Sequence, residues 1–333
     1  MKKLTYSLLP LGITFGLCLN IAPASAGLVV QNVISNAALS IDGFGSTTNS
    51  GFIQANIPTG SIIQRAYLYA ASVWDNPVKG VTFHGNALSV GSATILGPDE
   101  NPATTARWDV TSIIASSFTG GLQDFSILED GQNDGAVLVV AYSNPSTQGL
   151  TSVILDGELS TGGDTVAFNF ASPYTGGDFL VSLASSYSDQ PDQATEIDVT
   201  TDSTINRRLT SSAGGADDRT TGESSQNGNL ITVGGIGDNP TNPGPFDSPS
   251  LGPRIDDEYY NLALGNSANS APFISPGDTF LSLTTKNSSK DDNLFGMFIT
   301  SGLKSTVPEP SMTLGIFGIG AIGILLSRRG KKS

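Results

Sequence analysis

The chain is almost devoid of cysteine and histidine, the residues on which much enzyme and metal chemistry depends. Its 333 residues include one cysteine, Cys18, and one histidine, His84. Cys18 lies in an N-terminal segment that we expect to be removed, which leaves no cysteine for a disulfide or a thiolate nucleophile. A Ser-His-Asp triad would have to use His84, and zinc sites built from histidine and cysteine are excluded by supply. His84 itself lies between a short strand and a Gly-Asn turn in VTFHGNAL, an ordinary position for a half-exposed side chain.

Positive charge is also scarce between the two ends of the chain. The whole sequence has 16 Lys and Arg against 30 Asp and Glu, which gives a net charge of −14. Residues 27–304 hold 10 of the basic residues and 29 of the acidic ones. Such a surface repels nucleic acid and anionic membranes and attracts cations, so the nucleic-acid-binding classes are excluded.

A helical period of 3.6 is nearly absent from the apolar pattern, whereas a period of two recurs along the chain. Short apolar runs bounded by Gly, Pro, Asn or Asp are typical of strands. These runs are GSIIQRAYLYAASVW, ATILG, FSILED, GAVLVVAYS, TSVILDGEL, DTVAFNFA, DFLVSLASS, TEIDVTT, NLITVGG, TFLSLTT and LFGMFITS. They predict an all-β fold, an antiparallel β-sandwich or jelly-roll with long Gly/Asp/Pro-rich loops, plus a C-terminal hydrophobic helix. Residues 136–141 are apolar on both faces, which predicts a central strand.

Two short helices are expected within this β framework. One is WDVTSIIASSF, with Asp109 or Thr111 as its cap and with Ile113 and Ile114 turned inward. The other is DDEYYNLAL, whose leading acidic residues suit the start of a helix.

The domain organisation follows from shifts in composition. Residues 200–257 are rich in Gly, Ser, Asp and Pro, which predicts a long loop region, although NLITVGG within it has the pattern of a strand. We therefore expect a signal peptide over 1–26, a β-sandwich body over 27–304, and a separate C-terminal segment over 305–333.

The N-terminal segment has the three parts of a secretory signal. A short basic start is followed by a largely apolar stretch over 4–19, and Ala24 and Ala26 frame a small-residue cleavage site. We expect export through the Sec translocon and cleavage by signal peptidase after Ala26.

The C-terminal segment combines a rigid motif, an apolar stretch and a basic cluster. At a rise of about 1.5 Å per residue, the apolar stretch over 311–327 is barely long enough to form a transmembrane segment across a hydrocarbon core of about 30 Å. The cations that follow it, beginning with Arg328 and Arg329, predict a cytoplasmic C-terminus. Pro308 and Pro310 keep the preceding motif extended and accessible.

Val307-Pro308-Glu309-Pro310, the apolar stretch and the terminal basic cluster, in this order, resemble the PEP-CTERM sorting signal of exported bacterial proteins. The resemblance implies that Pro308, Glu309 and Pro310 are recognised by exosortase, an integral-membrane protease or transpeptidase that removes the tail. The alternative is a linker before a permanent membrane anchor. In the body, AYLYAASVW, VTFHGNALSVG, RWDVTSII, DGAVLVVAYSNP, SVILDGE and DDEYYNL followed by DDNLF resemble an uncharacterised domain of exported bacterial and archaeal proteins. That second resemblance implies a surface-protein context and no activity.

Acidic turns supply the candidate metal ligands. In EDGQNDG, Asp130, Gln132 and Asp134 occupy positions 1, 3 and 5 of an EF-hand-like loop. Ala141 stands where the bidentate Glu would be, so a partial calcium loop and a plain turn are the two interpretations. Cations could also be shared between loops at two further clusters, Asp256 with Asp257 and Asp291 with Asp292. Ca²⁺ is the one cofactor that the sequence suggests, with solvated turns as the alternative.

These features predict an exported cell-surface or extracellular-matrix protein that is not an enzyme. Its partners would be the Sec translocon, signal peptidase, exosortase and surface polysaccharide, and no nucleic acid. It would lie in the cytoplasmic membrane in transit and then at the cell surface or outside the cell. The alternative is a carbohydrate-binding or carbohydrate-active secreted protein that uses Ca²⁺ and its acidic loops.

Overall fold

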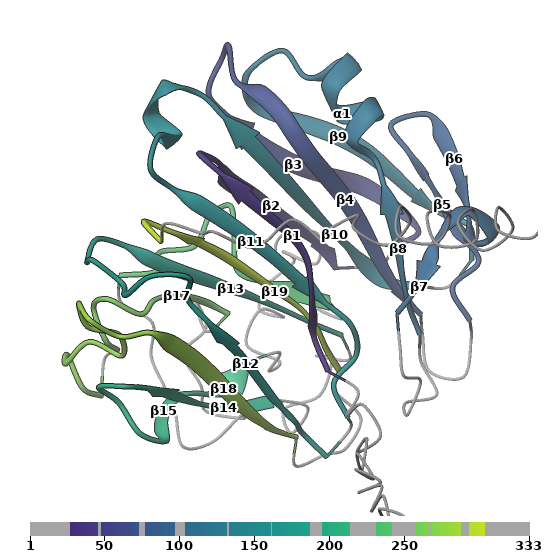
Figure 1. Ribbon diagram of the computed structural model, residues 1–333. Helices are drawn as coiled ribbons and strands as arrows, with labels where there is room; N and C mark the ends of the chain where they lie inside the picture. The colour runs from purple at the N-terminus through teal and green to yellow at the C-terminus, as the bar shows by residue number, and fades with distance from the viewer. Residues whose placement is uncertain are drawn as a thin grey trace, which may run out of the picture.

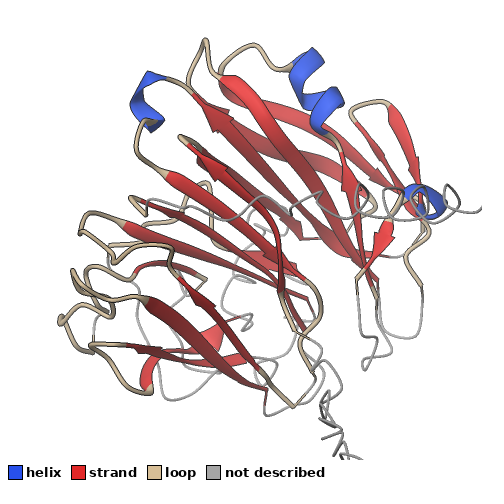
Figure 2. Ribbon diagram, in the orientation of Figure 1, coloured by secondary structure: helices blue, strands red, loops and turns tan. Residues whose placement is uncertain are grey.

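Strands make up most of the chain in the computed structural model, as Figure 2 shows. The structure describes residues 27–45, 48–72, 77–96, 104–131, 133–160, 162–186, 195–213, 231–241, 258–266, 268–287 and 293–303. All strand pairs in these ranges are antiparallel, which confirms the predicted all-β, sandwich-like fold. The predicted C-terminal hydrophobic helix lies outside the described residues.

Residues 38–143 form one β-sandwich, which we call the N-terminal sandwich (Figure 1). Its outer sheet, sheet 1, has the strand order β3-β9-β5-β6, and its inner sheet, sheet 2, has the order β2-β10-β4-β8-β7. The elements are β2 (Ala38–Gly45), β3 (Ser50–Ile57), β4 (Ile62–Ser72), β5 (Gly80–Phe83), β6 (Asn86–Ser89), the 3₁₀ turn η1 (Val90–Ser92), β7 (Thr94–Ile95), β8 (Thr105–Asp109), α1 (Thr111–Ser117), β9 (Gly121–Glu129) and β10 (Asn133–Ser143).

A second β-sandwich, the C-terminal sandwich, is built from residues 151–301 and the first strand of the chain. Its inner sheet, sheet 3, has the order β1-β11-β19-β13-β16, with β17 also paired to β13, and its outer sheet, sheet 4, has the order β12-β18-β14-β15. The elements are β1 (Val29–Ser35), the linking 3₁₀ turn η2 (Pro145–Thr147), β11 (Thr151–Asp156), β12 (Thr165–Asn169), β13 (Phe179–Ser186), β14 (Thr195–Thr201), β15 (Arg207–Ala213), β16 (Ile231–Val233), β17 (Tyr259–Asn261), β18 (Phe280–Asn287) and β19 (Asn293–Ser301).

The two sandwiches stack face to face, so that four sheets lie in the order 1, 2, 3, 4 (Figure 1). One apolar cluster fills the space between sheets 1 and 2, and another fills the space between sheets 3 and 4. A third cluster joins sheets 2 and 3. Sheets 2 and 3 are therefore buried on both faces, and the outer sheets have one face toward solvent.

The central strand predicted over 136–141 is β10, which lies between β2 and β4 in sheet 2. Ala136, Leu138 and Val140 face the cluster shared with sheet 1, whereas Val137 and Val139 face the cluster shared with sheet 3. An uninterrupted apolar run is required because both faces of this strand are covered.

The outer sheets contain strands with the alternating pattern of half-buried β structure. In β14, Ile197 and Val199 are buried, while Glu196, Asp198 and Thr200 between them are only partly buried. This period of two is the pattern expected when one face of a strand contacts the core and the other contacts water.

The chain passes between the sandwiches twice, and the two links contact each other. Asn36 has a positive φ of 55°, a left-handed conformation that asparagine tolerates well. Its backbone N–H donates to the carbonyl of Leu150 at 2.7 Å, and its side-chain oxygen accepts from the N–H of Gly149 at 3.0 Å. Thr147 donates to the carbonyl of Asn36. The strand β1 is thereby held in sheet 3 while the next strand enters sheet 2.

The helix predicted in WDVTSIIASSF is confirmed as α1, with Ile114 buried. Thr111 lies at its start, where its N–H donates to Asp109 Oδ1 at 3.0 Å. The helix predicted in DDEYYNLAL is wrong, because residues 259–261 form β17. Its strand pairing with β13 places Tyr260 in the core of the C-terminal sandwich.

Within residues 200–257, which were expected to be a long loop, the structure has two strands, β15 and β16. The strand β16 coincides with the predicted NLITVGG strand. The strand β15 was not expected, because its polar sequence RRLTSSA buries chiefly Leu209 and Ala213 in the apolar cluster.

All three apolar clusters lie between Leu28 and Leu303. Residues 27–304 thus contain the complete described core, and we use this span as a unit that folds on its own.

Candidate functional site

The structure places two of the candidate calcium ligands, in different surroundings. Asp130 is exposed just after β9, where its backbone N–H donates to the carbonyl of Gly80 at 3.0 Å. Asp134 is buried in β10, beside the register shift between Asn133 and Gly135. Among the described residues, no group of three or more His, Cys, Asp or Glu side chains is arranged to hold a metal ion. The Ca²⁺ site therefore stays a prediction.

The remaining sequence-predicted residues lie outside the described part of the chain. They are Gln132, Asp256, Asp257, Asp291 and Asp292 of the candidate calcium set, Ala24 and Ala26 of the signal peptide, and Pro308, Glu309, Pro310, Arg328 and Arg329 of the sorting signal. The predicted transmembrane segment over 311–327 lies there too. In the ranges that the structure describes, no helix has the length and apolar character needed to cross a membrane.

A hollow of about 280 Å³ opens where the two sandwiches meet, and it is the candidate binding site of the body. One side is formed by β2 and β3, and the other by β17 and the residues that follow β16. The lining residues are Leu39, Ser40, Ile41, Asn56, Gly235, Ile236, Gly237 and Tyr259. A site of this kind exists only when the two sandwiches are stacked, because each contributes one wall.

Close backbone packing holds the wall after β16 in place. The N–H of Ile236 donates to the carbonyl of Ile41 at 2.9 Å, and the N–H of Gly235 donates to Asp238. A Cβ atom at residue 235 would lie 2.2 Å from the carbonyl oxygen of Ile41, so glycine is needed for this approach. The hollow is therefore bounded by ordered backbone on this side.

The polar groups of the hollow are uncharged. Burial, followed by the negative charge of Asp238, raises the pKa of Tyr259 to about 12, so its phenol stays protonated at neutral pH. A protonated phenol both donates and accepts hydrogen bonds, as does the amide of Asn56. The described lining includes no Lys or Arg. These walls suit a neutral ligand rich in hydroxyl groups.

Asp42 lies on β2, just past the residues that line the hollow. Its Oδ2 accepts a 2.5 Å hydrogen bond from the N–H of Gln54 on β3, and Ser40 Oγ accepts from the N–H of Asn56 at 2.8 Å. Burial raises the pKa of Asp42 from 3.8 to about 7, even though the backbone hydrogen bond from Gln54 lowers it, and nearby Asp124 raises it further. The carboxyl thus changes charge near neutral pH at a position that fixes β3 against β2.

A buried polar network crosses the interface between sheets 2 and 3. Tyr69 donates to Asp156 Oδ2 at 2.8 Å, and Arg107 Nη1 contacts the same oxygen at 2.5 Å. The Arg107 guanidinium also lies 5.0 Å from the ring centroid of Tyr67, whose hydroxyl donates to Asn32 at 2.7 Å. The network therefore links β4 and β8 of sheet 2 to β1 and β11 of sheet 3.

Burial opposes charge on this network. It raises the pKa of Asp156, while the hydrogen bonds and charge of Arg107 lower it again. A buried carboxylate is tolerated only when it is paired, so Arg107 and Tyr69 are what allow Asp156 to occupy the interface. Asp156 Oδ1 accepts no hydrogen bond within the described chain, so removal of Arg107 would leave its charge nearly uncompensated.

The sequence analysis did not single out the hollow or the network. The signal for the network was present, since Arg107 and Asp156 interrupt strands whose neighbours are otherwise apolar or small. Nothing in the sequence indicated the hollow, because its walls come from segments around residues 40, 56, 236 and 259 that are joined only by the tertiary fold.

We predict that Arg107→Met lowers the free energy of unfolding of residues 27–304 by about 3 kcal/mol, because it leaves Asp156 buried without its cation. The matched control is Arg65→Met, since Arg65 pairs with Asp109 in the same two strands but their side chains are 39% and 50% exposed. The control should lose less than about 1 kcal/mol. Urea unfolding followed by the fluorescence of buried Trp108 measures both. Equal losses would contradict the structural role of the network.

We also predict that Asp42→Asn stabilises the protein at pH 8 and has little effect at pH 4. Between about pH 4 and 7 the folded chain keeps a proton on Asp42 that the unfolded chain has released, so the free energy of unfolding falls as pH rises through this window. Asparagine retains an acceptor for Gln54 and does not titrate. The gain at pH 8 should reach at most about 4 kcal/mol. Urea unfolding at pH 4, 6 and 8 tests this, and a gain independent of pH would refute it.

Comparison with known proteins finds a family signal in the C-terminal segment. The family model of the PEP-CTERM protein-sorting motif matches residues 306–329. None of the curated proteins that were compared matches the chain. The solved structure of PNGF-II in a C2 space group is similar over 83% of this chain, at 9% sequence identity and a TM-score of 0.23. The chain spans 64% of the length of that structure, and a TM-score this low carries no argument about fold or function.

The PEP-CTERM match confirms the resemblance of the C-terminal segment, which contains Pro308, Glu309 and Pro310 in the expected order. Proteins with this motif are processed by exosortase and are destined for the cell surface or the extracellular space. The chain is accordingly a PEP-CTERM sorting-signal protein, exported with exosortase as its processing partner.

Proposed function

We propose that the chain is a non-enzymatic structural protein of the cell surface or extracellular matrix, and that exosortase cleaves it near Pro308-Glu309-Pro310. The observation that carries this proposal is the sorting motif at residues 306–329, placed opposite a predicted signal peptide. Sec translocation and signal peptidase cleavage after Ala26 bring the body across the membrane. The segment over 311–327 holds it there until processing, and the body then joins or is released into surface polysaccharide.

The environments of the titratable groups support a structural role. His84 is exposed in the turn between β5 and β6, at a φ of 47°, and its ring contacts Phe125 at 5.2 Å between centroids. Asp42 holds a backbone N–H, and Asp156 holds Arg107 and Tyr69. These groups stabilise strands and sheets, and they are engaged in ways that do not pair a base with a nucleophile.

A second candidate function is carbohydrate binding, and the hollow is the observation that favours it. Its volume suits about one sugar ring, which is at the small end of ligand sites. The protonated phenol of Tyr259, the amide of Asn56 and exposed backbone can exchange hydrogen bonds with hydroxyl groups. The acidic surface disfavours anionic sugars, so the ligand would be a neutral one.

We predict that Glu309→Ala blocks removal of the tail, because it destroys the charged centre of the processing motif while keeping both prolines. In a host that contains exosortase, mass spectrometry of surface-located protein should find residues 328–333 absent from the wild type and present in the variant. Ser305→Ala, outside the matched motif, is the control and should be processed like the wild type. Intact residues 328–333 on most wild-type molecules at the surface would refute cleavage.

The carbohydrate candidate has its own test in residues 27–304. If the hollow binds a neutral glycan, Tyr259→Ala should abolish the signal on a glycan array and Ile205→Ala, an exposed residue far from the lining in sequence, should leave it unchanged. Reducing-sugar release in the same samples separates binding from hydrolysis. Silence of the wild type on the array would dispose of this candidate and leave the structural proposal standing.

A further inference from the structure

The first strand, β1, forms an open edge of sheet 3. It pairs with β11 along one side, from Val29 opposite Asp156 to Ser35 opposite Thr151, and with no strand on its other side among the described residues (Figure 1). In an antiparallel pair, roughly half of the backbone N–H and C=O groups of a strand point away from its partner. The outer side of β1 therefore presents hydrogen-bonding groups to solvent.

The side chains on and around β1 offer no protection by charge. Val29 and Val30 are 58% and 48% exposed, which is unusual for valine in an acidic protein of this size. Residues 27–41 contain no charged side chain, whereas acidic residues are frequent in the rest of the body. Edge strands are normally blocked by charges, short length or covering groups, since an open edge pairs with other chains.

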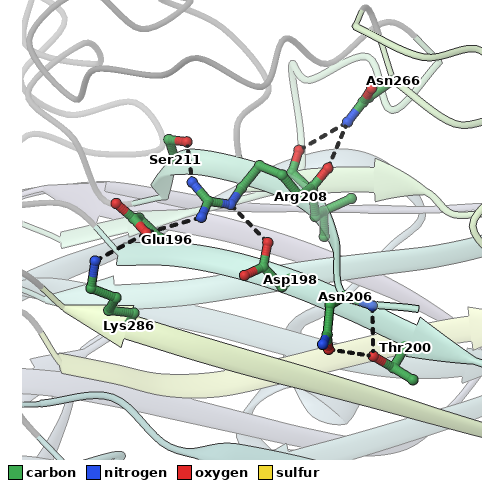
Figure 3. Close-up of polar contacts among 9 residues, drawn as sticks. Glu196, Asp198, Thr200, Asn206, Arg208, Ser211, Asn266 and Lys286 are labelled. Atoms are coloured by element: carbon green, nitrogen blue, oxygen red, sulfur yellow. Dashed lines mark hydrogen bonds and ion pairs between the residues drawn. The ribbon is translucent and has the colours of Figure 1, made fainter. Parts of the chain in front are cut away.

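Other edge strands of this protein are blocked. Figure 3 shows the edge of sheet 4, where Asn266 donates to the carbonyls of Arg208 and Leu209 on β15, both at 3.2 Å. On the same strand Arg208 is held by Asp198 at 2.8 Å and by Glu196 at 3.0 Å. A further strand could neither reach those carbonyls nor approach this charge cluster at low cost.

The remaining edges are covered or short. The N–H groups of Gln54 and Asn56 on β3 donate to side chains of β2, and the Ile41 carbonyl of β2 accepts from Ile236. The edge strands β6, β7, β16 and β17 have four residues or fewer, and β12 has five, against seven in β1. In the described structure β1 thus combines length, lack of charge and an uncovered side.

We propose that β1 is a self-association surface, at which the β1 strands of two copies pair antiparallel about a two-fold axis and join their third sheets into one. A second copy is the favoured partner because antiparallel pairing makes one strand complementary to itself. It also brings the two acidic bodies together at an uncharged stretch, where like-charge repulsion is smallest. A basic partner would find no complementary charge along this edge.

The geometry limits the strength of this contact. A bulge between Val30 and Asn32 interrupts the ladder with β11, so regular pairing is confined to residues 32–35 of each copy, with the exposed valines packing beside it. Such a contact buries less than the roughly 1,200 Å² of a stable interface. We therefore expect a weak dimer that forms at high local concentration, as on a crowded surface. This inference is independent of the proposed sorting and of sugar binding.

The test is sedimentation velocity of residues 27–304 from about 10 μM to about 1 mM, a range that covers weak dimers. The average mass of the wild type should rise toward that of a dimer. Val29→Glu combined with Val30→Glu should stay monomeric, because four carboxylates then meet at the two-fold contact. Ile62→Glu combined with Ile205→Glu adds the same charge at two other exposed positions and should associate like the wild type.

Hydrogen exchange of the wild type alone supplies a second measurement that needs no variant. The amides of β1 should exchange more slowly at the high concentration than at the low one, and those of β12 should not change. A wild type that stays monomeric to about 1 mM overturns the proposal, and so does association without added protection in β1. Association of the Val29/Val30 variant as strong as that of the wild type overturns it as well.

Discussion

The structure depends on the burial of both faces of sheets 2 and 3 against each other. Tyr69 is at the centre of this contact, with its ring 5.8 Å from both Phe295 and Phe298 and its hydroxyl bonded to Asp156. Without this contact each sandwich would expose an apolar face, which soluble domains rarely do over a large area. The same stacking creates the hollow beside Tyr259 and holds β1 at the side of sheet 3, so the candidate sites all follow from it.

This arrangement also explains how a cysteine-free exported body is held together. The chain has no disulfide to constrain it once Cys18 is removed, and Arg107 with Asp156 is a buried ion pair that joins the sandwiches. Buried pairs add little net stability compared with apolar residues, but they penalise any other alignment in which one partner is left alone. Apolar area supplies the stability, and the polar network restricts the two sandwiches to one way of stacking.

The sequence predicts the local structure of this fold better than its assembly. The runs in β4, β10, β11, β13 and β19 are recognisable because a strand covered on both faces must be apolar throughout. The polar strand β15 and the short β17 were missed or misread, because their identity depends on pairing with β14 and β13. The fourfold layering was not predicted, since the same apolar runs would serve a single sandwich. The hollow and the open edge of β1 are products of that layering and have no local signature.

The position of the two chain ends in sheet 3 has a mechanical consequence. The strands β1 and β19 lie on either side of β11 and are antiparallel to it, so they run parallel to each other. Val29 pairs with Asp156 at one end of β11, and Ser301 pairs with Thr151 at the other, so the ends of the folded body leave from opposite ends of the sheet. Tension between them would load these ladders in shear, and their hydrogen bonds, which lie across the strands, would have to break together. The N-terminal sandwich lies outside this line of force, so it could be stretched or replaced without weakening the link between the two ends.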